Sequence, residues 1–172
     1  GDWDAYEGQY FAEFDRDIHT CEPFEIPSHW RTYFTMDYGL DMAAFYLIAV
    51  SEDNRAYVIA EHCQGKDNDM EPLLITDAID VVKNMCKGRS IHAYIAPPDL
   101  WQTNQATGKS VATTFAEHSI FLTKASNNRV QGWLQVKEWL KPIGDMDGKK
   151  TARLKIFANC NTLISHIPML QY

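Results

Sequence analysis

Two aspartates, Asp37 and Asp99, are the residues whose positions best suit catalysis. Asp37 closes the strand-like run RTYFTMDY, just before an aromatic residue and Gly39. An unpaired carboxylate inside a buried strand is costly or becomes protonated, whereas at a strand's end it can point into a cleft. Asp99 stands three residues beyond the run SIHAYIA, which Pro97 and Pro98 close. If these two strands are neighbours, the two carboxylates share one cleft.

The chemistry expected of such a pair is metal-assisted phosphoryl transfer. Two neighbouring carboxylates repel each other unless a cation bridges them, and hard oxygen ligands select Mg²⁺ or Mn²⁺. In two-metal sites the ions lie about 3.5–4 Å apart, where one activates water and the other stabilises the departing alkoxide. A lone aspartate at a strand end is more often a turn or cap residue. A second acid on the predicted neighbouring strand favours a metal site.

The elements that must position these acids follow from hydrophobic periodicity and turn residues. Strands are predicted at 31–38, 43–50, 56–62, 90–96, 120–125 and 152–158. Helices are predicted at 71–87, 109–119, 128–141 and from 161 onward, with Gly88 ending the first of them. The run GDMDGKK, with Asp145 and Asp147, is predicted to be a solvated turn because it lacks the remaining ligands of a calcium loop.

This order of elements predicts an α/β fold with a mixed central sheet flanked by helices. A right-handed crossover through helix 71–87 would place strand 90–96 parallel and next to strand 31–38. The hairpin 43–61 should extend the sheet on one side. Residues 1–30, aromatic and acidic with two prolines, are expected to form an extended arm that packs on the domain at 31–172.

Composition limits the class of protein. A chain of 172 residues with 45% hydrophobic content suits one globular domain, and we expect no membrane association because no apolar run is long enough to span a bilayer. Four cysteines without a CxxC pair favour reduced thiols in a cytoplasmic protein. A metal held by Cys63 and Cys86 with His62 and His92 is the less favoured alternative. Trp133 and Trp139 are predicted to pack in the core, and His118 and His166 to be structural.

The net charge of −7 hides an asymmetry along the chain. Residues 1–80 contain 4 Lys/Arg and 18 Asp/Glu, whereas residues 81–172 contain 12 and 5. The basic half could present one face to phosphate, although two ordinary solvated faces explain the asymmetry equally well. The candidate DNA-binding residues are Lys109, Lys124, Arg129, Lys149, Lys150 and Arg153.

Five runs of the sequence together carry a resemblance to a known family. In order they are GDWDAYEGQYFAEFD, PFEIPSHWRTYFTMDYG, APPDLWQTNQATGKSVATTFAEH, NNRVQGWLQVKEWLK and LKIFANCNTLISHIP. Over nearly the whole chain they resemble the C-terminal nuclease domain of tailed-phage terminase large subunits. The resemblance implies a ribonuclease H-like fold and metal-dependent endonuclease cleavage of concatemeric double-stranded viral DNA during packaging.

The resemblance also implies roles for individual residues. Asp37 corresponds to the acid that binds the catalytic metals, and Asp99 to the second acid, which some relatives carry where Ala96 stands. A third acid is expected in a segment like DHALDALRY, which has no counterpart before Tyr172. We therefore expect a domain truncated at its C-terminus, with a weak second metal site and poor cleavage, and Asp41 is the first candidate for a further ligand.

Partners are implied in the same way. They are double-stranded DNA, the terminase ATPase domain of the same full-length chain, the portal and the small terminase subunit, all in the bacterial host cytoplasm. The run ATGKS lacks the first glycine of a phosphate-binding loop, where Thr103 stands, so no nucleotide site is predicted.

Two other functions are alternatives to the nuclease. One is a catalytically silent DNA-binding or motor-docking module, in which the acids only stabilise the fold. The other is an actin-like nucleotide-binding half, for which the sequence offers no glycine-rich phosphate loops.

Overall fold

The computed structural model describes residues 8–172, so the first seven residues of the predicted arm lie outside the described part. Seven strands form one sheet in the order β1-β9-β4-β3-β2-β5-β6, and two more form a separate hairpin. The sheet strands are β1 (Thr20–Cys21), β2 (Arg31–Tyr38), β3 (Met42–Val50), β4 (Ala56–Gly65), β5 (Ile91–Ala96), β6 (Leu122–Lys124) and β9 (Leu154–Phe157). The predicted α/β class with a mixed sheet flanked by helices is confirmed.

The chain divides into two compact units, each built from segments that are separated in sequence. One unit contains the described residues up to 30 together with 49–59 and 128–172, and the other contains 31–48 and 60–127. We call them the first and the second unit. Both acids of the predicted site, Asp37 and Asp99, belong to the second unit.

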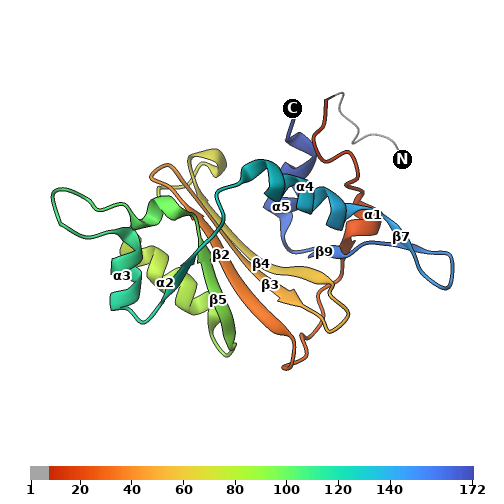
Figure 1. The fold of residues 1–172 in the computed structure, drawn as a ribbon, viewed down its shortest axis with the longest axis horizontal. Coiled ribbons are helices and arrows are strands. Elements are labelled where there is room, and N and C mark those ends of the chain that lie inside the picture. Colours follow the sequence, from red (N-terminus) through yellow and green to blue (C-terminus); the bar gives the residue numbers. More distant parts are fainter. Residues whose placement is uncertain (1–7) are drawn as a thin grey trace. The chain divides into compact units, whose positions relative to one another are not determined.

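In the second unit, β2 and β5 pair in parallel, as the sequence predicted. The register joins Thr35 to Ile95, and Figure 1 shows the two strands side by side. Alternate residues of β2 are buried, among them Phe34 and Met36, which is the pattern of a strand with one face on the core. The crossover helix α2 (Ile75–Cys86) buries an apolar stripe of Ala78, Ile79, Val82 and Cys86.

The first helix of the second unit ends just before the predicted glycine, whereas the next begins two residues later than predicted, after a capping serine. Gly88 follows α2 with φ of +73°, a left-handed conformation that glycine adopts without a steric penalty. Ser110 caps α3 (Val111–Glu117) by accepting a hydrogen bond from the backbone N–H of Thr113. Two short 3₁₀ helices complete the unit, η1 (Lys66–Asn68) and η2 (Pro98–Trp101).

In the first unit, the predicted arm joins the sheet through its backbone. It contains the short helix α1 (Arg16–His19), and β1 pairs in parallel with β9 through Thr20 and Ile156. β9 also pairs in parallel with the start of β4. The remaining elements are α4 (Arg129–Leu140), the hairpin strands β7 (Ile143–Gly144) and β8 (Lys150–Thr151), α5 (Asn161–His166) and η3 (Ile167–Met169).

Helix α4 forms as predicted, but the prediction that Trp133 packs in the core is wrong. Leu140 is the buried residue of this helix, whereas Trp133 is 45% exposed. The Trp133 ring instead packs edge-on against the ring of Tyr10 at a centroid distance of 4.9 Å. No helix within residues 8–172 is long and apolar enough to cross a membrane.

Candidate functional site

The parallel pairing of β2 with β5 brings the ends of the two acid-bearing strands to one edge of the sheet. Thr35 is opposite Ile95, Asp37 follows Thr35 by two residues, and Asp99 follows Ile95 by four in η2. The carboxyl ends of parallel strands meet at the same edge, so both aspartates belong to that edge. Both side chains are exposed.

Asp37 lies beside an open pocket of about 390 Å³ at the turn between β2 and β3. The pocket is lined by Asp37, Gly39, Leu40, Asp41, Met42 and Ala44. Within the part of the chain that the structure describes, the carboxylates of Asp37, Asp41 and Asp99 take part in no hydrogen bond or ion pair. Their oxygen atoms are therefore available to a ligand.

The β2–β3 turn, which carries Asp37 and Asp41, is held by backbone hydrogen bonds. The N–H of Gly39 donates to the carbonyl of Met42 at 3.0 Å, and the N–H of Lys66 donates to the carbonyl of Asp41 at 2.8 Å. Gly65 has φ of +143°, and a Cβ atom there would collide with the Asp41 carbonyl oxygen. Sequence reasoning missed Gly65, although a glycine at the end of a strand often marks close backbone approach.

Tyr38, next to Asp37, anchors the end of β2. Its hydroxyl donates a hydrogen bond of 2.7 Å to the carbonyl of Leu73, which precedes α2. Partial burial, and then the charge of Asp77, raise the pKa of the Tyr38 hydroxyl. The phenol therefore stays protonated at neutral pH and remains a donor to Leu73.

The donor set fits a hard divalent cation in part. Carboxylate oxygens are the ligands that Mg²⁺ and Mn²⁺ prefer, and water can complete their coordination. No group of three or more His, Cys, Asp or Glu side chains close enough to hold a metal occurs within residues 8–172. The alternative site of Cys63 and Cys86 with His62 and His92 is likewise not formed among these described residues.

Lys124 is the predicted DNA-binding residue that lies at the edge of the two acids. It ends β6 and is opposite Ala96 in the parallel pairing of β5 with β6. Its Nζ lies 5.2 Å from the ring centroid of Trp101, which is in the same 3₁₀ helix as Asp99. Sequence reasoning had assigned no role to Trp101.

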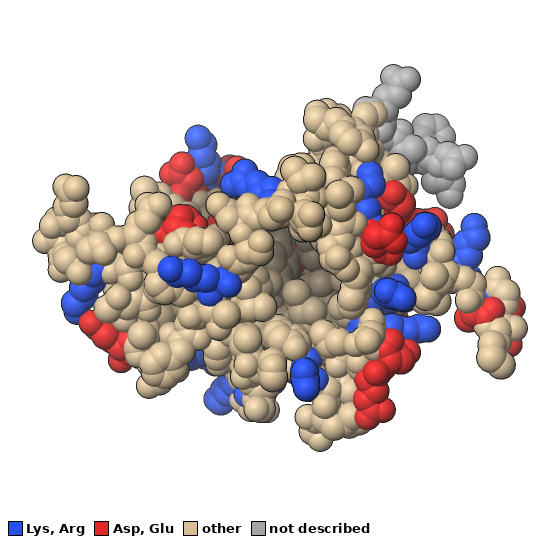
Figure 2. Space-filling model, in the orientation of Figure 1, with Lys and Arg blue, Asp and Glu red and all other residues tan. Residues whose placement is uncertain are grey.

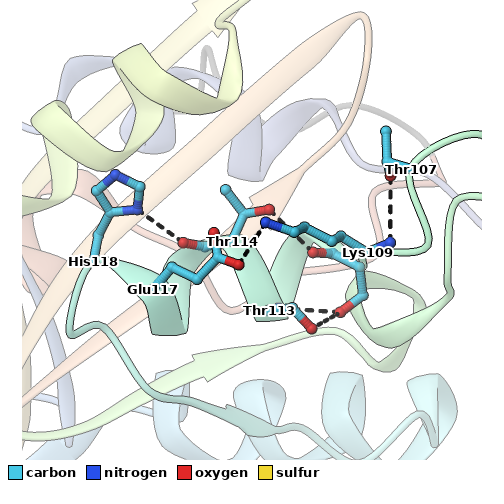
Figure 3. Close-up of polar contacts among 7 residues, drawn as sticks. Thr107, Lys109, Thr113, Thr114, Glu117 and His118 are labelled. Carbon is cyan, nitrogen blue, oxygen red and sulfur yellow. Dashed lines mark hydrogen bonds and ion pairs between the residues drawn. The ribbon is translucent and has the colours of Figure 1, made fainter.

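Lys109, another predicted DNA contact, is already engaged. Its Nζ lies 2.7 Å from a carboxylate oxygen of Glu117, and its backbone N–H donates to the hydroxyl of Thr107 (Figure 3). The ion pair joins the loop before α3 to the last residue of that helix. In the same view the His118 ring contacts the carbonyl of Thr114 at 2.9 Å, in keeping with the structural role predicted for it.

The other four basic candidates belong to the first unit. Arg129 begins α4, Lys149 and Lys150 are in the β7–β8 hairpin, and Arg153 precedes β9; all four are exposed. On the face drawn in Figure 2, basic and acidic side chains are interspersed among other residues. DNA contact by these four residues stays a prediction.

The run GDMDGKK, with Asp145, forms an exposed turn, as the sequence predicted. One carboxylate oxygen of Asp145 accepts hydrogen bonds from the backbone N–H groups of Asp147 at 3.0 Å and Lys149 at 2.8 Å. Such bonding is typical of an aspartate that shapes its own turn. One carboxylate oxygen of Asp145 is thereby engaged within its own turn.

Comparison with known proteins identifies the fold of this chain. No family model matches the sequence, and no curated protein matches it either. Among solved structures, the large terminase of a thermophilic bacteriophage in complex with ADP superposes with a TM-score of 0.75 at 16% identity, covering 95% of this chain. The P22 large terminase nuclease domain gives a TM-score of 0.71 at 17% identity, covering 95% of this chain and 79% of that one.

A third structure, the large terminase nuclease from the thermophilic phage G20c with bound magnesium, gives a TM-score of 0.61 at 12% identity. It covers 97% of this chain and 82% of that one. The present chain spans 37% of the length of the ADP-bound large terminase that it matches. This chain has the fold of the nuclease domain of phage large terminases.

Proposed function

We propose that this chain is the divalent-metal-dependent DNA endonuclease domain of a phage packaging terminase. The observation that carries the proposal is the parallel pairing of β2 with β5, since it brings Asp37 and Asp99 to one edge of a sheet. The fold shared with terminase nuclease domains and the magnesium bound in the G20c nuclease support the same reading.

Asp37 and Asp99 would hold the metal, and Asp41, which lines the same pocket as Asp37, is a further carboxylate that could join them. A bound Mg²⁺ or Mn²⁺ supplies charge stabilisation and activates water for phosphodiester hydrolysis. The part of this chain's own residues is to bind the ion through carboxylate oxygens and to orient the phosphate. Because two carboxylates neutralise only two positive charges, we expect a first ion to bind and a second to bind weakly.

The turn around Gly39 and Gly65 serves this function by fixing where Asp37 and Asp41 stand. Gly39 lines the pocket with them, which leaves room for the substrate backbone. Lys124, at the same sheet edge, supplies a positive charge toward the phosphate. The remaining candidates, Lys109, Arg129, Lys149, Lys150 and Arg153, would extend the contact along the duplex backbone, which is sequence-independent.

The substrate we propose is concatemeric double-stranded DNA, cut during packaging in the bacterial host cytoplasm. The terminase ATPase domain in the same full-length protein, the portal and the small subunit would be its partners. In this organisation residues 8–30, the described part of the predicted arm, pack on the nuclease domain at 31–172.

The test is nicking of supercoiled plasmid in Mn²⁺ or Mg²⁺, comparing the parent chain with Asp37→Asn and Asp99→Asn. Asp147→Asn is the matched control, because its carboxylate is exposed and lies in the β7–β8 turn of the first unit. Loss of nicking in both site variants but not in the control supports the nuclease. Equal nicking by all four proteins contradicts it.

A catalytically silent DNA-binding or docking module is the second candidate. The observation that favours it is that no group of three metal-binding side chains occurs among residues 8–172. A silent module would bind duplex DNA with the same affinity whether Asp37 is aspartate or asparagine, and calorimetric titration would detect no Mn²⁺ binding.

A further inference from the structure

A second pocket lies beside the proposed catalytic edge, and the proposed reaction makes no use of it. It has a volume of about 250 Å³ and is lined by Trp101, Ala112, Thr113, Ala116, Phe121 and Leu122. These residues come from η2, α3 and the start of β6, all in the second unit. Ligand sites for drug-sized molecules are larger, roughly 300–1,000 Å³, so this pocket suits a single small ring system.

Two aromatic rings make the pocket suited to a flat ligand. Phe121, the residue before β6, is 70% exposed, whereas the preceding residue, Ile120, is buried. The small side chains of Ala112 and Ala116 on α3 leave the space between the helix and the rings open. An exposed aromatic ring beside an open pocket offers a face on which a nucleobase can stack.

Lys124 places a positive charge over one of the two rings that line this pocket. Its ammonium group lies 5.2 Å from the centroid of the Trp101 ring, a cation–π contact. Among residues 8–172, no acidic side chain forms an ion pair with Lys124, in contrast to Lys109. The lysine charge is therefore free to meet an anion.

The same short helix connects this pocket to the proposed metal site. Asp99 and Trp101 are both in η2, and Lys124 is opposite Ala96, the last residue of β5. If a phosphodiester of a DNA strand lay at Asp99, the neighbouring nucleotides of that strand would lie beside Lys124 and the two aromatic rings. A base paired inside a duplex has no free face, so only an unpaired base could enter.

We propose that Trp101, Phe121 and Lys124 form a nucleotide subsite, in which Lys124 binds a backbone phosphate and an unpaired base stacks on Phe121. The subsite deepens the proposed nuclease function and rests on it for the identity of the strand. It predicts that the domain holds an opened strand next to the cut more tightly than intact duplex. Phe121 and Lys124 position the strand here and take no part in bond breaking.

The experiment measures binding without cleavage. An Asp37→Asn protein in EDTA is titrated into fluorescein-labelled oligothymidylate and, separately, into a labelled duplex of the same length, with fluorescence anisotropy as the readout. Phe121→Ala should weaken single-strand binding by about 5- to 150-fold, which is the effect of losing one base stack, and should change duplex binding less than about twofold. Lys124→Gln should weaken both and lower the single-strand salt slope by about 0.7.

Two matched controls separate the subsite from general surface effects. Leu74→Ala removes another exposed apolar side chain of the second unit, and Lys83→Gln removes an exposed charge from α2; both should leave single-strand affinity unchanged. Unchanged single-strand affinity in Phe121→Ala, or equal losses on single strand and duplex, would overturn the subsite. Circular dichroism melting verifies that each variant is folded.

The subsite and the nuclease can fail separately. If Asp37→Asn leaves plasmid nicking unchanged while Phe121→Ala loses single-strand binding, the subsite stands and the nuclease assignment falls. If nicking depends on Asp37 but Phe121→Ala binds single strands normally, the nuclease stands and the subsite falls. A pocket that serves a protein partner instead would also give this second result.

Discussion

The molecule contains two acidic turns that look alike in sequence and differ in what their carboxylates do. In the β7–β8 turn, Asp145 uses a carboxylate oxygen to bind the backbone N–H groups of Asp147 and Lys149. In the β2–β3 turn the closing bonds are backbone to backbone, from Gly39 to Met42 and from Lys66 to Asp41. The Asp37 and Asp41 carboxylates are left to line a pocket, so an acid becomes available for function where the backbone closes the turn without it.

Two lysines of the second unit, Lys109 and Lys124, differ in the same way. Lys109 is paired with Glu117, so part of its charge is already neutralised within the protein. Lys124 rests over an aromatic ring, which attracts a cation without cancelling its charge. For the aspartates as for the lysines, a charged group that already has a polar partner within the protein has a structural role. A charged group without such a partner can bind a ligand.

The largest effect expected from this comparison is on cleavage. Asp37→Asn should lower the rate of Mn²⁺-dependent plasmid nicking by about 10²–10³-fold, the scale on which removing one group that stabilises transition-state charge acts. Asp145→Asn should nick at the parent rate, since the amide oxygen can still accept the turn's hydrogen bonds. Equal losses in the two variants would show that the two turns do not differ in function.

The next largest effect tests how the β2–β3 turn is built. Gly65→Ala should lower the free energy of unfolding by about 1–3 kcal/mol, because the new Cβ would collide with the Asp41 carbonyl in a strained backbone conformation. It should also reduce nicking by displacing the acids. Urea denaturation measures the first effect and plasmid nicking the second.

Gly132→Ala is the matched control for this substitution. Gly132 lies in α4 with open space around its Cα, so alanine should stabilise the helix by about 0.5–1 kcal/mol. A Gly65→Ala protein as stable as the parent would mean that the turn does not depend on the close approach.

The third prediction is a substitution that lowers stability and leaves activity unchanged. Asp145→Ala removes an acceptor of two backbone hydrogen bonds and should cost about 1–3 kcal/mol of unfolding free energy, at about 0.5–1.5 kcal/mol for each bond. Nicking should not change. A stable Asp145→Ala protein that has lost nicking would place Asp145 with the functional acids and reverse the comparison.

The smallest expected effect separates the two lysines. Lys124→Gln should reduce the slope of log affinity for duplex DNA against log salt by about 0.9, the value for one lost phosphate contact. Lys109→Gln should change the slope less, because Glu117 competes with phosphate for that ammonium group. Duplex binding in EDTA at several salt concentrations measures both slopes, and an equal decrease in the two variants would contradict the distinction.

Much of the fold followed from local pattern and chain topology. The alternation of apolar residues predicted β2 and β5, the helical spacing predicted α2, and the crossover rule predicted that the two strands pair in parallel, as they do. The first candidate pair, Asp37 and Asp99, could be chosen because an acid at a strand end is visible in the sequence itself. Gly88 acted as a helix-end signal because capping is a local interaction.

Other features depended on contacts between residues far apart in the chain. β1 has two residues, too few for a periodic signal, and forms because β9 offers it an edge. Trp133 is half-exposed because its partner is Tyr10 and not the interior of the domain.

The site shows the same division between local and tertiary information. Asp37 and Asp99 could be named from their places at predicted strand ends and Lys124 from its charge, but the sequence did not distinguish Lys124 from five other basic residues. The register of β6 against β5 decided that Lys124 lies opposite Ala96, and the approach of β4 to the β2–β3 turn favours glycine at position 65. Periodicity records which face of an element is apolar, whereas register and close approach arise only when separate elements pack.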